Sequence, residues 1–111
     1  MLKRIIPSSR KFLPVIGLGT SRVFDIKPTK ELLAIRKNIM DILLNNGGTL
    51  IDTSPMYGKS EEVIGRLIEN YDRKEELFLA TKVWTKGQLE GENQIKESFK
   101  KMHTSKIQLI Q

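Results

Sequence analysis

The chain has 111 residues, of which 39% are hydrophobic and 29% are charged, so it has the size and composition of one globular domain. It contains no cysteine, which excludes disulfide scaffolds, thiolate metal sites and cysteine nucleophiles and fits a reducing compartment, so we expect a cytoplasmic protein. No apolar run approaches the roughly 20 residues of a membrane-spanning helix, and we expect no membrane partner.

The net charge of +6 comes mainly from the start of the chain. Residues 1–24 contain Lys and Arg but no acidic residue, whereas residues 25–111 are nearly balanced. A nucleic-acid-binding segment would interleave basic residues with aromatic ones, and Phe12 is the single aromatic residue before Phe24. We therefore predict no nucleic-acid partner. A cleaved targeting segment is the alternative, but the apolar run "LPVIGLG" is short and broken by glycines, which favours a structural segment.

Strand and helix patterns alternate along the chain. At the start, "KRII" and "KFLP" flank "PSSR" and predict a small hairpin. Four apolar segments then predict strands at 14–19, 49–52, 77–83 and 107–110. Apolar residues at helical spacing predict three helices between them, at 30–46, 61–70 and 92–102. Thr29 and Ser60 are the expected N-caps of the first two helices, and Gly47 is expected to end the first.

Strands separated by helices of this length predict parallel pairing through right-handed crossovers. The strand period is close to 30 residues, which fits either a doubly wound sheet or a (βα)8 barrel of about 250 residues. A nucleotide-binding doubly wound sheet needs a G-x-G-x-x-G turn, and Arg22 occupies the third glycine position of "GLGTSR". The sequence therefore favours an α/β fold of the (βα)8 TIM-barrel type, of which residues 1–111 supply the hairpin and the first four strands.

Charged residues lie near the ends of two predicted strands, where packing would favour apolar side chains. Asp52 ends "TLID", and Lys82 falls near the end of "LFLATKV". Catalytic groups of barrels lie at the carboxyl ends of strands, and strand alternation lets both side chains point into the barrel mouth. Because a buried charge is costly unless it is paired, we expect Asp52 and Lys82 to be partners. A purely structural ion pair is the alternative interpretation.

Tyr57 follows Asp52 on a loop that contains Pro55 and Gly58. A cation beside a tyrosine hydroxyl favours loss of its proton, which makes the hydroxyl a better proton donor near neutral pH. Asp52, Lys82 and Tyr57 thus form a candidate general-acid group for carbonyl reduction, and the hydride for that reaction implies a nicotinamide cofactor. The alternative for Tyr57 alone is a loop aromatic residue that packs on the rim of the barrel.

Four segments carry a family resemblance across nearly the whole chain. "PVIGLGT", "GGTLIDTSPMYGKSEEVIGRLI", "ELFLATKVW" and "SKIQLIQ" have the order and spacing of aldo-keto reductases, so the sequence resembles the first half of that family. The resemblance implies a (βα)8 barrel with a short N-terminal hairpin. It further implies reduction of aldehyde and ketone carbonyls with NADPH, which would bind across the barrel mouth without a dinucleotide-binding Rossmann domain.

The resemblance also implies roles for individual residues. It implies that Asp52, Tyr57 and Lys82 are catalytic, with Tyr57 as the proton donor. Cofactor binding falls to Gly19 and Thr20 together with Asp52 and Lys82. Trp84 is implied in the substrate pocket, a small carbonyl compound is the expected partner, and no metal is expected.

The family's fourth catalytic residue, a histidine, follows the fourth strand and would come shortly beyond Gln111. His103 lies earlier, between the third helix and the fourth strand, and we expect it to be an exposed residue at a helix end. We therefore expect residues 1–111 to form the N-terminal half of one barrel domain and to be inactive alone, with the activity belonging to the full-length protein. The alternative is a non-catalytic half-barrel that self-associates through its exposed strand edges.

Overall fold

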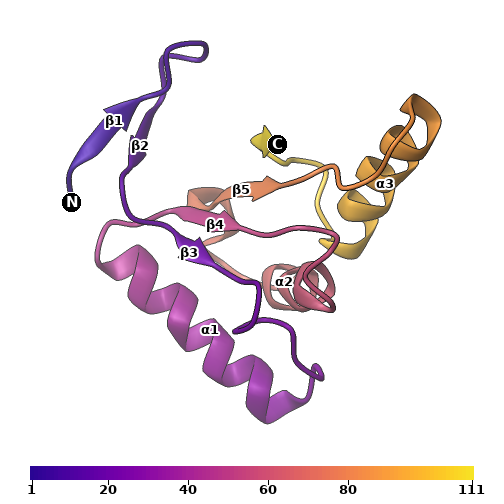
Figure 1. The fold of residues 1–111 in the computed structure, drawn as a ribbon. Coiled ribbons are helices and arrows are strands. Elements are labelled where there is room, and N and C mark those ends of the chain that lie inside the picture. The colour runs from indigo at the N-terminus through magenta and orange to yellow at the C-terminus, as the bar shows by residue number, and fades with distance from the viewer.

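The computed structural model describes residues 1–111 as a two-stranded hairpin followed by a parallel sheet and its helices (Figure 1). The hairpin strands β1 (Lys3–Ile5) and β2 (Phe12–Pro14) pair antiparallel, with Lys3 opposite Pro14. The hairpin lies at the end of the molecule where the strands of the parallel sheet begin. The predicted hairpin is confirmed.

Four parallel strands pair in the order β3-β4-β5-β6. Their bounds are Leu18–Gly19 for β3, Leu50–Asp52 for β4, Phe78–Thr81 for β5 and Leu109–Ile110 for β6. The prediction of a strand over 14–19 was wrong at its start, because Pro14 pairs with the hairpin and the chain joins the parallel sheet only at Leu18. The last strand is shorter than predicted because the side chain of Gln108 takes a place in the ladder, accepting from Leu79 N at 2.7 Å.

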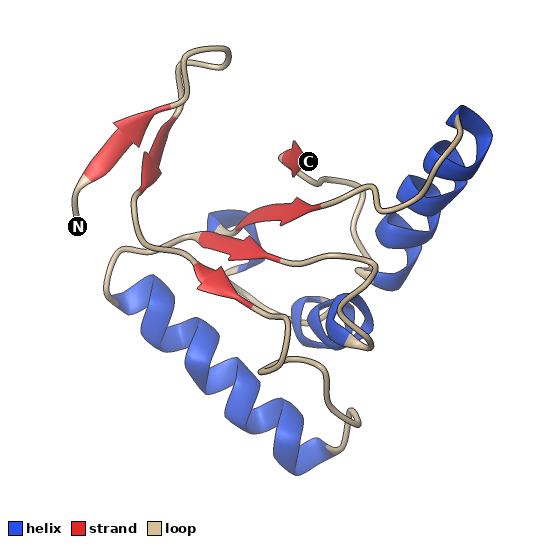
Figure 2. Cartoon of the chain, viewed as in Figure 1, coloured by secondary structure: helices blue, strands red, loops and turns tan.

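All three α-helices lie on one face of the parallel sheet (Figure 2). They are α1 (Lys30–Asn45), α2 (Ser60–Ile68) and α3 (Gln88–Lys101), and a short 3-10 helix, η1 (Lys74–Glu76), precedes β5. A doubly wound sheet would carry helices on both faces and would reverse its strand order. In a (βα)8 barrel, successive strands are neighbours and all helices lie on the outer face of the sheet. The strand order and the helix positions found here follow that pattern, so the architecture confirms the predicted fold class. None of the helices is long and apolar enough to cross a bilayer.

The helix ends confirm one predicted N-cap and correct another. The side chain of Thr29 accepts a hydrogen bond from Leu32 N at the start of α1, as predicted. Ser60 lies inside α2 as its first residue, and its hydroxyl donates to the Thr20 carbonyl oxygen at 2.8 Å instead of capping the helix. Helix α3 begins at Gln88, four residues before the predicted start at residue 92. The prediction missed this first turn because its residues are mostly exposed and carry no apolar periodicity.

The hydrophobic core fills the space between the sheet and the helices. Strand alternation points Ile51 of β4 and Leu79 of β5 into this core, where both are almost fully buried. It points Asp52 and Lys82 to the opposite face, which carries no helix. The core consists of 11 buried residues: Phe24, Met40, Leu44, Ile51, Val63, Ile64, Ile68, Tyr71, Leu77, Leu79 and Met102.

A polar contact on the outer side fastens α1 to the segment after α2. Tyr71 Oη donates to Asp41 Oδ1 at 2.6 Å, and Lys37 Nζ donates to Asp41 Oδ2 at 2.9 Å. These hydrogen bonds, first the one from Tyr71, hold the pKa of Asp41 below its usual value. Burial and the hydrogen bond to Asp41 raise the pKa of Tyr71. The contact joins two segments that are 30 residues apart in the sequence.

Two glycines in the helices differ in the space available for the methyl group that a substitution by alanine would add. A Cβ at Gly65 in α2 would overlap the carbonyl oxygen of Lys101, whereas a Cβ at Gly91 in α3 would make an ordinary contact with Val83 Cγ1 at 3.5 Å. Gly65→Ala is expected to push α2 away from α3 and to lower the free energy of unfolding by about 1–3 kcal/mol. Gly91→Ala should raise it by about 0.5–1 kcal/mol, because alanine favours a helix over glycine. Urea unfolding measures both variants, and a stabilised Gly65→Ala would contradict this packing.

The Asp41–Tyr71 contact predicts a pH-dependent loss of stability. Tyr71→Phe is expected to lower the free energy of unfolding by about 1–2 kcal/mol at neutral pH, because a hydrogen bond to a charged group is lost. Since folding lowers the pKa of Asp41, its stabilising effect is complete above the pKa of an unfolded aspartate and disappears as the pH falls through the folded-state pKa. The difference between wild type and variant should therefore shrink below about pH 4. Urea unfolding between pH 7 and pH 3 tests this, and a constant difference would refute it.

Candidate functional site

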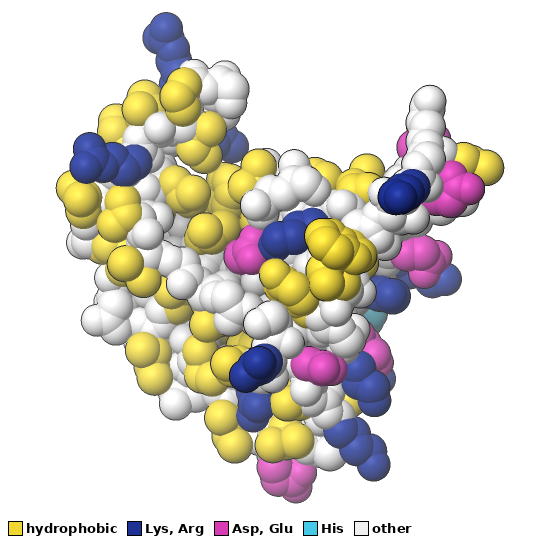
Figure 3. Space-filling view, in the orientation of Figure 1, with side chains coloured by type: hydrophobic (Ala, Val, Ile, Leu, Met, Phe, Trp, Pro, Cys, Tyr) yellow, Lys and Arg dark blue, Asp and Glu magenta, His cyan; other side chains and the backbone are white.

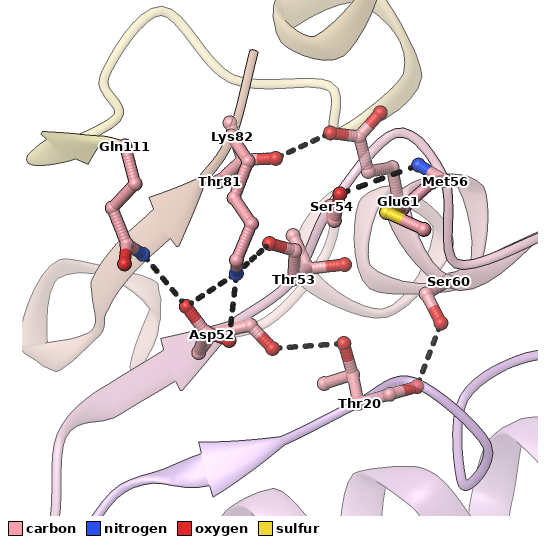
Figure 4. Close-up of polar contacts among 10 residues, drawn as sticks. All are labelled: Thr20, Asp52, Thr53, Ser54, Met56, Ser60, Glu61, Thr81, Lys82 and Gln111. Carbon is pink, nitrogen blue, oxygen red and sulfur yellow. Dashed lines mark hydrogen bonds and ion pairs between the residues drawn. The ribbon is translucent and has the colours of Figure 1, made fainter. Parts of the chain in front are cut away.

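The candidate site lies at the carboxyl ends of β4 and β5, on the face of the sheet that carries no helix. The ammonium group of Lys82 donates to both carboxylate oxygens of Asp52 at 2.9 Å (Figure 4). The backbone register pairs Asp52 with Ala80 in β5. Lys82 lies two residues after Ala80, directly beyond the end of β5, and its side chain reaches back to Asp52. The structure thus brings together the two charged residues that the sequence predicts as partners.

Two further groups complete the hydrogen bonds of this pair. Lys82 Nζ also donates to the carbonyl oxygen of Thr53 at 2.9 Å. Gln111, which follows β6, donates from Nε2 to Asp52 Oδ1 at 2.9 Å. Gln111 was not predicted as a site residue. The only sequence signal for this contact is the position of Gln111, two residues after Leu109 and directly beyond β6, the strand that pairs with β5. Three oxygen acceptors therefore fix the direction of the ammonium group.

Tyr57 lies beside this pair on the loop between β4 and α2. Lys82 Nζ lies over the face of the Tyr57 ring, 5.2 Å from its centroid. The Tyr57 side chain is half-buried. Tyr57 N donates to the Ser54 carbonyl oxygen at 3.0 Å, which folds the loop back on itself. Gly58 has φ +56°, and a Cβ there would overlap the Asp25 carboxylate, so the turn after Tyr57 requires glycine. The three predicted catalytic residues therefore meet at one place.

Gly19 ends β3 beside Asp52 and Thr20 follows it, and the two residues differ in how accessible they are to a ligand. Thr20 is fully buried, and its hydroxyl donates to the Asp52 carbonyl oxygen at 2.9 Å, while its own carbonyl accepts from Ser60. Gly19 pairs with Asp52 in the ladder, is exposed, and has open space where a Cβ would project. Of the two residues, Gly19 therefore leaves room for a ligand. Thr20 supports the site from inside, through its hydroxyl at the end of β4 and through its carbonyl oxygen at the start of α2.

A buried carboxyl group lies on the other side of β5. Glu61 in the first turn of α2 is 2% exposed, and its Oε1 accepts from the Thr81 hydroxyl at 2.6 Å. Its Oε2 is buried without a hydrogen-bond partner. Glu61 was not identified from the sequence, because its burial depends on how α2 packs against β5. Ser60 and Glu61 thus tie the start of α2 to both neighbouring strand ends, and the Tyr57 loop leads directly into this anchored turn.

Trp84 lies in the loop between β5 and α3 and is 63% exposed. It lines a shallow depression of about 360 Å³ with Val83, Thr85 and Lys86. Its backbone hydrogen bonds go to Gln94, and it follows Lys82 by two residues. Figure 3 shows the exposed face, with a basic and an acidic group side by side near its centre and hydrophobic side chains next to them.

His103 follows the end of α3 and is exposed, as predicted. Its Nδ1 is 3.4 Å from Glu69 Oε2, on the helix side of the molecule. No group of three or more His, Cys, Asp or Glu residues is arranged to hold a metal ion. At the candidate site itself, a carboxylate, an ammonium group and a phenol ring lie together, and groups of these kinds can transfer protons and hold charge.

The Glu61–Thr81 contact predicts different costs for two substitutions of Thr81. Thr81→Val leaves both carboxyl oxygens of Glu61 buried without a partner and is expected to lower the free energy of unfolding by about 1–3 kcal/mol. Thr81→Ser keeps the hydroxyl and loses one methyl group, so a smaller loss of about 0.5–1 kcal/mol is expected. Urea unfolding of both variants measures the difference. A valine variant as stable as the serine variant would show that this hydrogen bond contributes nothing.

Comparison with known proteins points to one family. Residues 15–111 match the family model described as the aldo/keto reductase family. Aldo-keto reductase YhdN from Bacillus subtilis (strain 168) is 36% identical over 80 residues, which cover 61% of this chain and 24% of that protein. Methylglyoxal reductase DkgA from Escherichia coli (strain K12) is 32% identical over 98 residues, which cover 87% of this chain and 32% of that protein.

Solved structures agree with this match. A protein described as a putative aldo-keto reductase from Pseudomonas aeruginosa superposes with a TM-score of 0.82 at 26% identity, over 98% of this chain and 44% of that chain. The chain therefore spans 24% and 32% of the length of the two curated relatives and corresponds to the N-terminal part of their family's barrel. The fold class predicted from the sequence is confirmed. The chain belongs to the aldo/keto reductase family.

Proposed function

We propose that this chain carries the proton-donating residues of an NADPH-dependent enzyme that reduces aldehydes and ketones. The observation that carries the proposal is the meeting of Asp52, Lys82 and Tyr57 at the carboxyl ends of adjacent strands. Family membership supports the reaction class, since its members are oxidoreductases that act on carbonyl groups. Because the chain spans 24% and 32% of the curated relatives, the activity is proposed for the protein that contains the rest of the barrel.

Each of the three residues has a separate task in the proposed reaction. The Tyr57 hydroxyl donates a proton to the carbonyl oxygen of the substrate. The Lys82 ammonium, 5.2 Å from the ring centroid, stabilises the negative charge that Tyr57 acquires when it gives up that proton. Asp52 holds the ammonium group in place with two hydrogen bonds, and Thr53 and Gln111 fix the pair from either side.

The residues around Gly19 fit a nicotinamide cofactor. Gly19 is exposed beside Asp52, and a side chain in its place would project into open space, so a flat ring can approach the backbone here. When bound, NADPH supplies the hydride that reduces the carbonyl carbon. An aldo-keto reductase from Klebsiella pneumoniae with the same fold was solved in complex with NADPH, at a TM-score of 0.76. We assign Gly19, Asp52 and Lys82 to this cofactor, with Thr20 acting from beneath through its hydrogen bond to the Asp52 backbone, and Trp84 to the substrate pocket.

A chimeric barrel tests the proposal. Residues 1–111 are joined to the part of YhdN that follows the matched segment, and the product is assayed for NADPH oxidation with a panel of aldehydes. We expect reduction by the chimera and no NADPH oxidation by the 111-residue chain alone. Tyr57→Phe should lower kcat by about 10²–10⁴-fold with little change in KM, because the proton donor is removed and the ring is kept.

The chain offers a matched control, since it contains two tyrosines. Tyr71→Phe removes the same hydroxyl on the helix side of the sheet and should leave kcat unchanged. A folded chimera that binds NADPH but reduces no aldehyde in the panel would refute the proposed function. Equal losses of kcat in the two variants would refute the role of Tyr57.

A further inference from the structure

Gln94 holds the backbone of Trp84 from both sides. Trp84 lies in the loop after β5, and Gln94 lies in the second turn of α3, half-buried. Trp84 N donates to Gln94 Oε1 at 2.5 Å, and Gln94 Nε2 donates to the Trp84 carbonyl oxygen at 3.3 Å. One amide side chain therefore satisfies the donor and the acceptor of a single loop residue, as a neighbouring strand would.

The rest of this loop is weakly held. All loop residues from Trp84 to Gly87 are exposed, with Trp84 at 63%, and the first residues of α3 that follow them, Gln88 to Glu90, are exposed as well. Val83, directly before the loop, is fixed by a hydrogen bond from its N–H to the Gln111 carbonyl oxygen at 2.8 Å. Beyond Val83, both backbone hydrogen bonds of Trp84 go to Gln94, so the Trp84 backbone, from which the indole projects, is held by this one side chain.

Gln94 is not needed for the start of the helix. Helix α3 begins at Gln88, and its N-cap, Gly87, makes no side-chain capping hydrogen bond. Gln94 lies beyond the first turn, where the backbone N–H groups are satisfied within the helix. The hydrogen bonds of its amide are therefore free to serve the loop, which gives this residue a role apart from helix stability.

We propose that Gln94 is a positioning residue that fixes the Trp84 indole beside the Asp52–Lys82–Tyr57 site and so restricts the carbonyl compounds that the site accepts. An exposed indole offers a large apolar face to a ligand. Substrates with an aromatic or other apolar group beside the carbonyl carbon depend on that face, whereas the smallest aldehydes do not. This consequence for substrates rests on the proposed function, but the effect of Gln94 on Trp84 does not.

Trp84 is the only tryptophan of the chain, so fluorescence of the 111-residue protein reports on this loop alone. In Gln94→Leu, which lacks both hydrogen bonds, we expect the fluorescence anisotropy to fall. The Trp84 amide hydrogen should exchange about fivefold faster or more, which corresponds to the loss of one backbone hydrogen bond. Asn93→Leu, at the exposed neighbouring position in α3, is the matched control and should leave both quantities unchanged.

Gln94→Glu separates the two hydrogen bonds. Its carboxylate still accepts from Trp84 N, so amide exchange should stay near the wild-type rate, but it offers no donor to the Trp84 carbonyl, so anisotropy should fall. This variant also decides the matter if circular dichroism shows that Gln94→Leu does not fold. Wild-type anisotropy in folded Gln94→Glu, or in folded Gln94→Leu, would overturn the proposal.

The consequence for substrates is measured in the chimeric barrel. Gln94→Leu should raise KM for benzaldehyde about fivefold, in line with one lost hydrogen bond, and should leave KM for acetaldehyde and kcat for both unchanged. An equal rise in KM for both aldehydes, or a fall in kcat alone, would overturn the role in specificity. If the unsubstituted chimera reduces neither aldehyde, the proposed function fails, whereas the anisotropy and exchange of the 111-residue chain still decide whether Gln94 positions Trp84.

Discussion

The register between β4 and β5 determines on which face of the sheet the central pair, Asp52 and Lys82, lies. Ile51 stands opposite Leu79 and Asp52 stands opposite Ala80, so alternate residues face the helices and the open side of the sheet. A shift of one residue in β4 would turn Ile51 to the open face and Asp52 into the core, where its charge would have no partner. The hydrophobic core therefore fixes the orientation of Asp52 and of the polar site built around it.

The first turn of α2 links the position of the Tyr57 loop to the strand ends. Ser60 is hydrogen-bonded to Thr20 at the end of β3, and Glu61 is hydrogen-bonded to Thr81 at the end of β5. Both contacts are buried, so they lie in a region of low dielectric constant, where a lost partner is costly. The loop that contains Tyr57 is thus held between two fixed points, β4 and the first turn of α2.

Much of the fold and the central pair followed from the sequence, because they depend on periodicity along the chain. The alternation of strands and helices and the spacing of Asp52 and Lys82 need no knowledge of tertiary contacts. Gln111, Glu61 and Gln94 could not be identified in this way. Their contacts join residues 59, 20 and 10 positions apart, and polar side chains at such spacings occur on any solvated surface. The packing of α2 and α3 against the sheet selects Glu61 and Gln94, and the pairing of β6 with β5 selects Gln111.

The exposure of the central pair argues that its value is not mainly structural. The Lys82 side chain is 22% exposed and that of Asp52 is 34% exposed, so solvent screens their attraction. Ion pairs at such positions typically contribute about 1 kcal/mol or less to stability, and an apolar pair of similar size could replace them without loss. Yet three oxygen atoms from two residues direct the Lys82 ammonium, and a third residue, Gln111, orients Asp52. In the proposed function, this orientation serves to hold a positive charge beside Tyr57, the proposed proton donor.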